Sequence, residues 1–152
     1  MDCGCSNNKL IPEQVATFLT YLSLWEKISK EKCPVLVCED DVALHPWWRE
    51  VMNNIALKAK KGKIDLDPNK PLLIRLGWGE NKEHKNTMFK LNREVRMSNP
   101  CHIITPVFAN KLLKEFKTIN NTVDVFMHRQ SYASKKFGWT AHPPAATELS
   151  WS

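Results

Sequence analysis

Two short apolar segments constrain the fold of this chain more than any other feature. Residues 35–38 (Val-Leu-Val-Cys) and residues 72–76 (Leu-Leu-Ile-Arg-Leu) are too short for helices and lie between polar or turn-forming residues. Short aliphatic, β-branched runs of this kind predict buried strands. Residues 14–29 and 47–60 instead carry apolar side chains at helical spacing. Helices that alternate with strands predict an α/β fold, with a mainly parallel sheet and flanking helices.

The second half of the chain continues the alternation. Residues 101–105 predict a third strand, and Thr105–Pro106 is a typical helix start. A further helix is expected to begin at Asn121 or Thr122 and to end before Gly138. Residues 80–96 predict a long surface loop or hairpin, and residues 139–152 an irregular tail. Since no repeat or low-complexity linker divides the sequence, a single domain over residues 1–152 is expected.

The composition is that of an ordinary globular protein. Of the 152 residues, 43% are hydrophobic and 25% are charged, and no apolar run approaches the ~18 residues of a membrane span. The N-terminus lacks the features of a signal peptide, so we expect a soluble, cytoplasmic protein without a membrane span. The five cysteines, which include Cys33, Cys38 and Cys101, are expected to be reduced thiols.

The positive charge is concentrated in one stretch. The formal net charge is +6, and residues 58–96 hold 11 of the 22 Lys and Arg residues against 5 acidic ones. A local surplus of this kind favours a polyanionic partner, such as nucleic acid, an anionic membrane surface or a phosphorylated small molecule. A solvated face without a partner is an equally good interpretation of the same charges.

Three adjacent carboxylates follow the first predicted strand. Glu39, Asp40 and Asp41 repel one another, and such clusters are often neutralised by a bound cation. In open α/β sheets, the carboxyl ends of strands form the ligand crevice. On an extended chain, Glu39 and Asp41 face one side and Asp40 the other, so at most two of the three can share one ion unless the chain turns there. The alternative is a solvated acidic turn that caps the next helix.

The sequence around these acids resembles glycosyltransferase family 25. Residues 24–28 (Leu-Trp-Glu-Lys-Ile) and 35–42 (Val-Leu-Val-Cys-Glu-Asp-Asp-Val) are similar to the family's helix, strand and E-D-D-V motif. Further similar segments follow in the family's order, namely residues 72–77, residues 101–113, residues 123–126, Pro143–Pro144 and Ser150. The resemblance implies a GT-A-like nucleotide-sugar transferase fold, here truncated, because the family's usual N-terminal strand has no counterpart before Ile11.

The resemblance also implies a reaction and a set of site residues. It predicts a metal-dependent transferase of lipopolysaccharide biosynthesis type, which moves a hexose from a nucleotide diphosphate sugar, most simply a UDP-hexose, to the hydroxyl of a glycan acceptor. Asp40 and Asp41, together with Glu39, correspond to the D-x-D element that holds Mn²⁺ or Mg²⁺ against the diphosphate. Asp124 is expected as the general base, and Glu148 is a second base candidate. His142 is a candidate ligand of the metal or of a phosphate.

Two other functions remain open from the sequence. One is a glycosyltransferase-like protein without catalysis that binds an anionic glycan or nucleic acid through the basic residues 58–96. Nucleic acid binding is the less favoured of these. The other is a metal-dependent nuclease, because clustered acids beside lysines also suit phosphodiester cleavage. For Asp124, a structural role at the start of a helix is an equally good interpretation.

Overall fold

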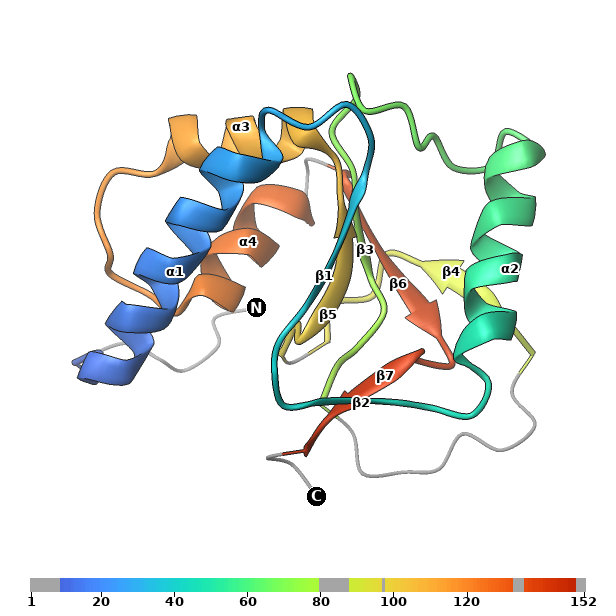
Figure 1. Ribbon diagram of the computed structural model, residues 1–152, viewed down its shortest axis with the longest axis horizontal. Coiled ribbons are helices and arrows are strands. Elements are labelled where there is room, and N and C mark those ends of the chain that lie inside the picture. Colours follow the sequence, from blue (N-terminus) through green and yellow to red (C-terminus); the bar gives the residue numbers. More distant parts are fainter. Residues whose placement is uncertain (1–8, 80–87, 97, 133–135, 150–152) are drawn as a thin grey trace.

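The fold is a five-stranded sheet with helices on both faces. The computed structural model describes residues 9–79, 88–96, 98–132 and 136–149 (Figure 1). In chain order its elements are α1 (Pro12–Ile28), β1 (Val35–Cys38), β2 (Val42–Leu44), α2 (Trp48–Lys60), β3 (Leu73–Arg75), β4 (Lys90–Asn92), β5 (Cys101–Ile104), α3 (Pro106–Glu115), α4 (Val123–Ser131), β6 (Gly138–His142) and β7 (Ala146–Glu148). The main sheet has the order β1-β5-β3-β6-β4, and β2 pairs with β7 separately. The α/β class with flanking helices is thus confirmed.

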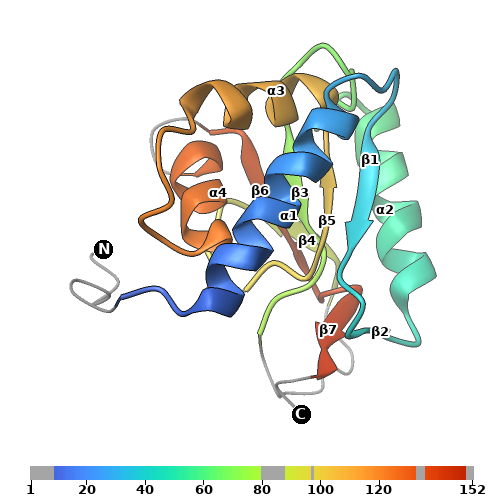
Figure 2. The same ribbon diagram turned by 60° about the vertical axis from the view of Figure 1, so that its left-hand side comes forward.

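The two faces of the sheet bury two separate apolar clusters. Helices α1, α3 and α4 cover one face and α2 covers the other (Figures 1 and 2). Successive side chains of a strand point to opposite faces, so Leu73 and Ile104 pack beneath α1, α3 and α4, whereas Ile74 and Ile103 belong to the cluster on the α2 side. Strands β3 and β5 are buried on both faces, which explains why their sequences are apolar except for Arg75 and His102.

The direction of the strands differs from the prediction of a mainly parallel sheet. Among the described strands of the main sheet, β3 and β6 alone pair in parallel, while β1–β5, β3–β5 and β4–β6 are antiparallel. Strands β1, β3 and β6 therefore run in one direction, as expected for strands that follow helices. Strand β5 runs between β1 and β3 in the opposite direction, because the described parts of the chain between β3 and β5 contain no crossover helix to return it to its starting end.

The C-terminal tail and residues 80–96 also differ from the sequence-based expectations. The tail contains β6, which pairs with β3 and β4, and β7, which pairs with β2. These two strands are stabilised by pairing with strands remote in the sequence, so the local sequence of the tail does not predict them. Residues 90–92 of the expected loop or hairpin form β4, which pairs with β6, while residues 80–87 lie outside the described part of the chain.

The helices begin close to their predicted positions. Helix α3 starts with Pro106 after Thr105, but the Thr105 side chain does not cap it. The Thr105 hydroxyl donates to the Lys70 carbonyl at 2.7 Å and accepts the Leu72 N–H at 2.9 Å, so it links β5 to the segment before β3. Within the described residues, we find no helix with both the length and the apolar character needed to cross a bilayer.

Candidate active site

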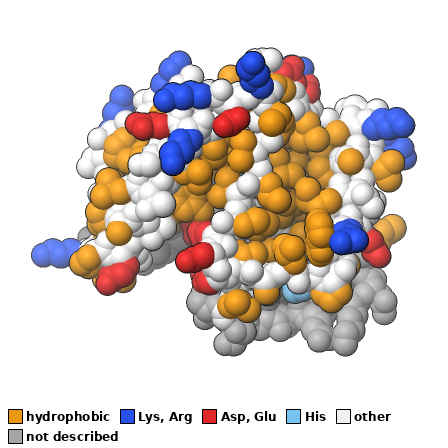
Figure 3. Space-filling model, viewed as in Figure 1, with side chains coloured by type: hydrophobic (Ala, Val, Ile, Leu, Met, Phe, Trp, Pro, Cys, Tyr) orange, Lys and Arg blue, Asp and Glu red, His pale blue; other side chains and the backbone are white. Residues whose placement is uncertain are grey.

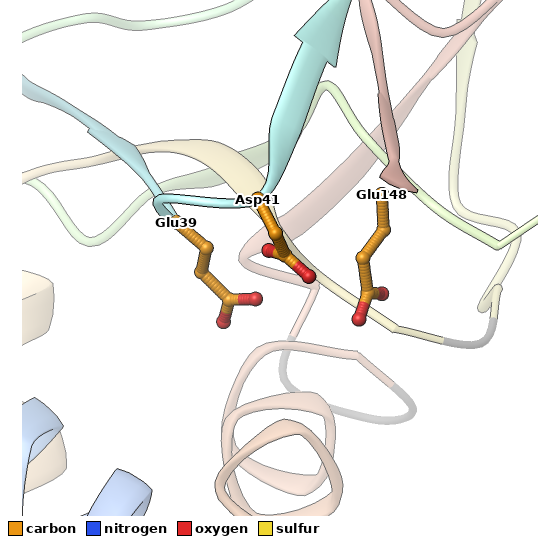
Figure 4. Close-up of side chains that lie close together, drawn as sticks. All are labelled: Glu39, Asp41 and Glu148. Atoms are coloured by element: carbon orange, nitrogen blue, oxygen red, sulfur yellow. The ribbon is translucent and has the colours of Figure 1, made fainter. Parts of the chain in front are cut away.

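Three carboxylates from different segments converge at one end of the sheet. Glu39 and Asp41 follow β1, and Glu148 ends β7. One carboxylate oxygen from each lies within 4.8 Å of the others, and all three side chains are half-buried. Figure 4 shows the three side chains extending in the same direction from neighbouring segments. We call these three residues the acidic cluster. Carboxylate oxygens at this spacing suit a hard divalent cation such as Mg²⁺ or Mn²⁺.

The pairing of β2 with β7 brings Glu148 to the acidic cluster. In that pairing Val42 lies opposite Glu148, and the Leu149 N–H donates to the Asp41 carbonyl at 2.8 Å. Ser98 donates its hydroxyl to Glu148 Oε2 at 2.6 Å. The backbone of Ser98 has a φ of 64°, a conformation that non-glycine residues rarely adopt and that is common at functional sites. Ser98 thus orients Glu148, and no sequence signal identified it.

Asp40 does not belong to the acidic cluster. Its side chain is exposed, and it is absent from the group of three carboxylates that the described residues bring together. The chain turns at Asp40 and Asp41, between β1 and β2, and this turn leaves Asp40 exposed while Asp41 lies half-buried beside Glu39. The structure therefore joins two of the three predicted acids and adds Glu148, which the sequence analysis had taken as a base candidate.

Glu39 is held by a tyrosine of α1. The Tyr21 hydroxyl donates to Glu39 Oε1 at 2.8 Å. Burial raises the pKa of Glu39 from 4.5 to about 7; the bond from Tyr21 opposes this shift, whereas the charges of Asp124, Glu148 and Asp41 add to it. Burial, followed by the charge of Glu39, also raises the pKa of Tyr21, so its hydroxyl remains a donor. Glu39 is therefore only about half ionised near neutral pH, and a nearby cation would favour its ionised form.

Asp124 lies in the first turn of α4, close enough to the acidic cluster for its charge to raise the pKa of Glu39. Its Oδ1 is shielded from solvent and has no hydrogen-bond partner among the described residues. Burial raises the pKa of Asp124 to about 6, the charge of Arg75 opposes the shift, and that of Glu148 adds to it. A carboxylate oxygen without a partner is available to accept a proton or a hydrogen bond from a ligand.

Arg75 is the counter-charge that the sequence analysis missed. It lies fully buried in β3, with its guanidinium 5.3 Å from the centre of the Tyr132 ring and in contact with His128 and the Arg96 carbonyl. Burial lowers the pKa of Arg75, and the charge of Asp124 partly offsets this. An arginine inside an otherwise apolar strand was the available signal, because a buried charge requires polar partners.

His142 lies apart from the acidic cluster. It ends β6 opposite Lys90, is nearly fully buried, and places Nε2 3.2 Å from Asn92 Oδ1 and 3.4 Å from Glu94 Oε2. Its ring also packs 5.3 Å from that of Trp78. These contacts connect His142 to β4, and the group of metal-ligating side chains around Glu39 does not include it.

A groove of about 520 Å³ leads along α1 to the acidic cluster. Its walls come from α1 and from the end of β1 with the acids that follow, and none of the described residues that line it is a lysine or arginine. The lining residues are Thr17, Thr20, Tyr21, Leu24 and residues 37–41. The volume is typical of small-molecule sites. Carboxylates without basic neighbours suit a neutral, hydroxyl-bearing ligand or a cation, and they repel an anion unless a metal is bound.

Comparison with known protein families gives a match over most of the chain. The family described as glycosyltransferase family 25 (LPS biosynthesis protein) matches residues 5–127. This range includes β1, Glu39, Asp41 and Asp124, whereas Glu148 and the similar residues Pro143–Pro144 lie beyond it. A search of curated proteins found no match.

Proposed function

Because the chain belongs to glycosyltransferase family 25, we propose that it transfers a hexose from a nucleotide diphosphate sugar, a UDP-hexose, to an acceptor hydroxyl with the aid of Mn²⁺ or Mg²⁺. Membership confirms the predicted family and the predicted enzyme class, a glycosyltransferase that acts on a sugar donor and an acceptor. The acceptor we propose is a glycan of the lipopolysaccharide type. The observation that carries the proposal is the convergence of Glu39, Asp41 and Glu148 within 4.8 Å.

The acidic cluster fits a divalent metal by the chemistry of its donors. Glu39, Asp41 and Glu148 would supply carboxylate oxygens and leave room for phosphate oxygens of the donor, as Mg²⁺ and Mn²⁺ prefer. When bound, the metal would stabilise the negative charge on the departing diphosphate. The raised pKa of Glu39 supports this assignment, because a cation would favour the ionised form that the free protein disfavours.

Asp124 is the general base in this proposal. With a pKa near 6 it is largely ionised at neutral pH, and it is basic enough to accept the proton of the acceptor hydroxyl. Its Oδ1 has no hydrogen-bond partner among the described residues but is shielded from solvent, so this role requires the bound substrates to bring the acceptor hydroxyl to that atom. Arg75 would hold the ionised form of Asp124 before the proton arrives. Glu148, whose Oε2 accepts the Ser98 bond within the cluster, serves as a ligand rather than as the base.

The groove beside α1 is the proposed acceptor site. It ends at Glu39 and Asp41, so an acceptor lying in it would present a hydroxyl to the donor bound at the acidic cluster. The apolar side chains of Leu24 and Val37 offer surface for the C–H face of a sugar ring, while Asp40 offers hydrogen-bond acceptors at the rim.

A calorimetric titration of Mn²⁺ in the presence of UDP or GDP tests the proposal. We expect the unmodified protein to bind Mn²⁺ together with UDP, and Asp41→Asn to weaken Mn²⁺ binding by about tenfold or more, since one anionic ligand is lost. Asp40→Asn is the matched control, because it removes the same charge from the adjacent exposed position. We expect it to bind Mn²⁺ nearly as the unmodified protein does.

Three results would contradict the assignment of the site. These are no Mn²⁺ binding with either nucleotide, equal losses in the two variants, or a larger loss in Asp40→Asn. The circular dichroism and the thermal midpoint of each variant show whether a loss of binding reflects a loss of fold. A panel of nucleotide sugars, with nucleotide release as the readout, then tests the transfer reaction and the identity of the donor.

A further inference from the structure

Two cysteines lie opposite each other on neighbouring strands. Cys38, the last residue of β1, pairs with Cys101, the first residue of β5, and their Sγ atoms are 3.5 Å apart. Both are free thiols. The cysteines were expected to be reduced thiols, but their sequence separation gave no indication that two of them meet.

The backbone pairing gives these cysteines the geometry of a cross-strand disulfide. The Glu39 N–H donates to the Pro100 carbonyl at 2.8 Å, so Glu39 and Pro100 form a hydrogen-bonded pair and the next pair, Cys38 and Cys101, is not hydrogen-bonded. Consistently, the Cys101 carbonyl accepts the Leu76 N–H from β3, on its other side. Cα atoms in such pairs are about 4.5 Å apart, within the range of about 4.4–6.8 Å seen for disulfides.

The two thiols differ in access. Cys38 is exposed, whereas Cys101 is buried. On the same face of the sheet, the neighbouring side chain of β1, Leu36, is 52% exposed. The space-filling view shows hydrophobic side chains at the surface between the α1 side and α2 (Figure 3). A small oxidant can therefore reach Cys38 first, and Cys101 is already in place to react with the product.

We propose that Cys38 and Cys101 form a reversible disulfide with hydrogen peroxide, or a related hydroperoxide, as the oxidant. The Cys38 sulfur attacks the O–O bond, which gives a sulfenic acid and one water. The Cys101 sulfur then attacks the Cys38 sulfur, the S–S bond forms, and the hydroxyl leaves with the Cys101 proton as a second water. Two thiols are oxidised by two electrons, and one peroxide is reduced to two waters. A dithiol reductant reverses the bond by exchange.

This disulfide would act at the base of the acidic cluster. Cys38 directly precedes Glu39, and Cys101 directly follows Pro100, whose carbonyl holds the Glu39 N–H. The disulfide would link the end of β1 to the start of β5, directly beside Glu39. The inference concerns the thiols alone, and it holds whether or not the protein transfers a sugar.

Peptide mapping of the oxidised protein tests the proposal. The folded protein is treated with a roughly equimolar amount of peroxide, alkylated, and digested with trypsin without reduction. Cleavage after Lys32, Arg49, Arg96 and Lys111 places Cys38 in residues 33–49 and Cys101 in residues 97–111. We expect these two peptides to be linked, with the loss of two hydrogens, and to separate after dithiothreitol. In Cys33→Ser the link must persist, because Cys38 is then the only cysteine in its peptide.

The unfolded chain provides the control. In urea, loop closure favours pairs close in the sequence, such as Cys3–Cys5 and Cys33–Cys38, over a pair 63 residues apart. A Cys38–Cys101 link that dominates in the folded protein and not in urea supports the proposal, and Cys101→Ser must abolish it. The proposal is overturned if the folded, unmodified protein gives no link between residues 33–49 and 97–111, or if Cys38 is converted only to the sulfinic acid.

Discussion

Replacing Glu39 by glutamine should stabilise the metal-free protein at pH 8 but not at pH 4. Burial raises the pKa of Glu39 from 4.5 to about 7. Between these two values the native state holds a proton that the unfolded chain releases, so the free energy of unfolding falls as the pH rises through this window. The difference between the two pKa values corresponds to a loss of roughly 3 kcal/mol in the free energy of unfolding. Because Glu39 is half-exposed, solvent screening reduces it to about 1–2 kcal/mol.

Glutamine keeps the shape of the side chain and does not titrate. Its Oε1 can still accept the Tyr21 hydroxyl, so Glu39→Gln removes the charge and keeps the bond. At pH 8 with a chelator present, we expect the variant to be about 1–2 kcal/mol more stable than the unmodified protein, which raises the thermal midpoint by about 2–8 °C. At pH 4 we expect no difference, because both native and unfolded states then carry the protonated acid.

The assay is thermal unfolding of the unmodified protein, Glu39→Gln and Asp40→Asn at pH 4 and at pH 8. Asp40→Asn serves as the control, since it removes a charge from the adjacent exposed residue and should change stability by less than about 0.5 kcal/mol. With Mn²⁺ added at pH 8, the unmodified protein should gain stability and Glu39→Gln should gain much less. The reasoning is refuted if Glu39→Gln is destabilised at pH 8, or if its effect is the same at both pH values.

Three further predictions follow from the contacts around the site. Gly138→Ala should lower the free energy of unfolding by about 1–3 kcal/mol in urea, because a Cβ there would lie 2.5 Å from a ring carbon of Tyr132, which is buried; an unchanged urea midpoint would contradict this. Tyr21→Phe removes the bond that lowers the pKa of Glu39, so Mn²⁺ titrations should show a larger loss of affinity at pH 6.5 than at pH 8.5. An equal loss of Mn²⁺ affinity at both pH values would show that Tyr21 does not act through the pKa of Glu39. Asp124→Asn should reduce kcat by about 10²–10⁴-fold while Mn²⁺ and donor binding persist. Turnover close to that of the unmodified protein would instead assign Asp124 a structural role.

The sequence by itself determined the local features of this protein. Helical spacing and the short aliphatic runs identified α1, α2 and the strands β1, β3 and β5 close to their observed bounds. The run of three acids after the first strand marked the segment that supplies Glu39 and Asp41 to the acidic cluster. The family was also recognisable, because its motifs are short and occur in a fixed order. All of these signals lie within a few residues of one another.

Tertiary structure decided which remote residues meet. Glu148 completes the acidic cluster because β7 pairs with β2 more than a hundred positions earlier, with Val42 opposite Glu148. The same holds for Cys101, which meets Cys38 only because β5 runs antiparallel to β1 in one register. A shift of one residue in either pairing would turn these side chains to the other face. That register depends on the packing of the whole sheet against its helices, which no local pattern in the sequence encodes.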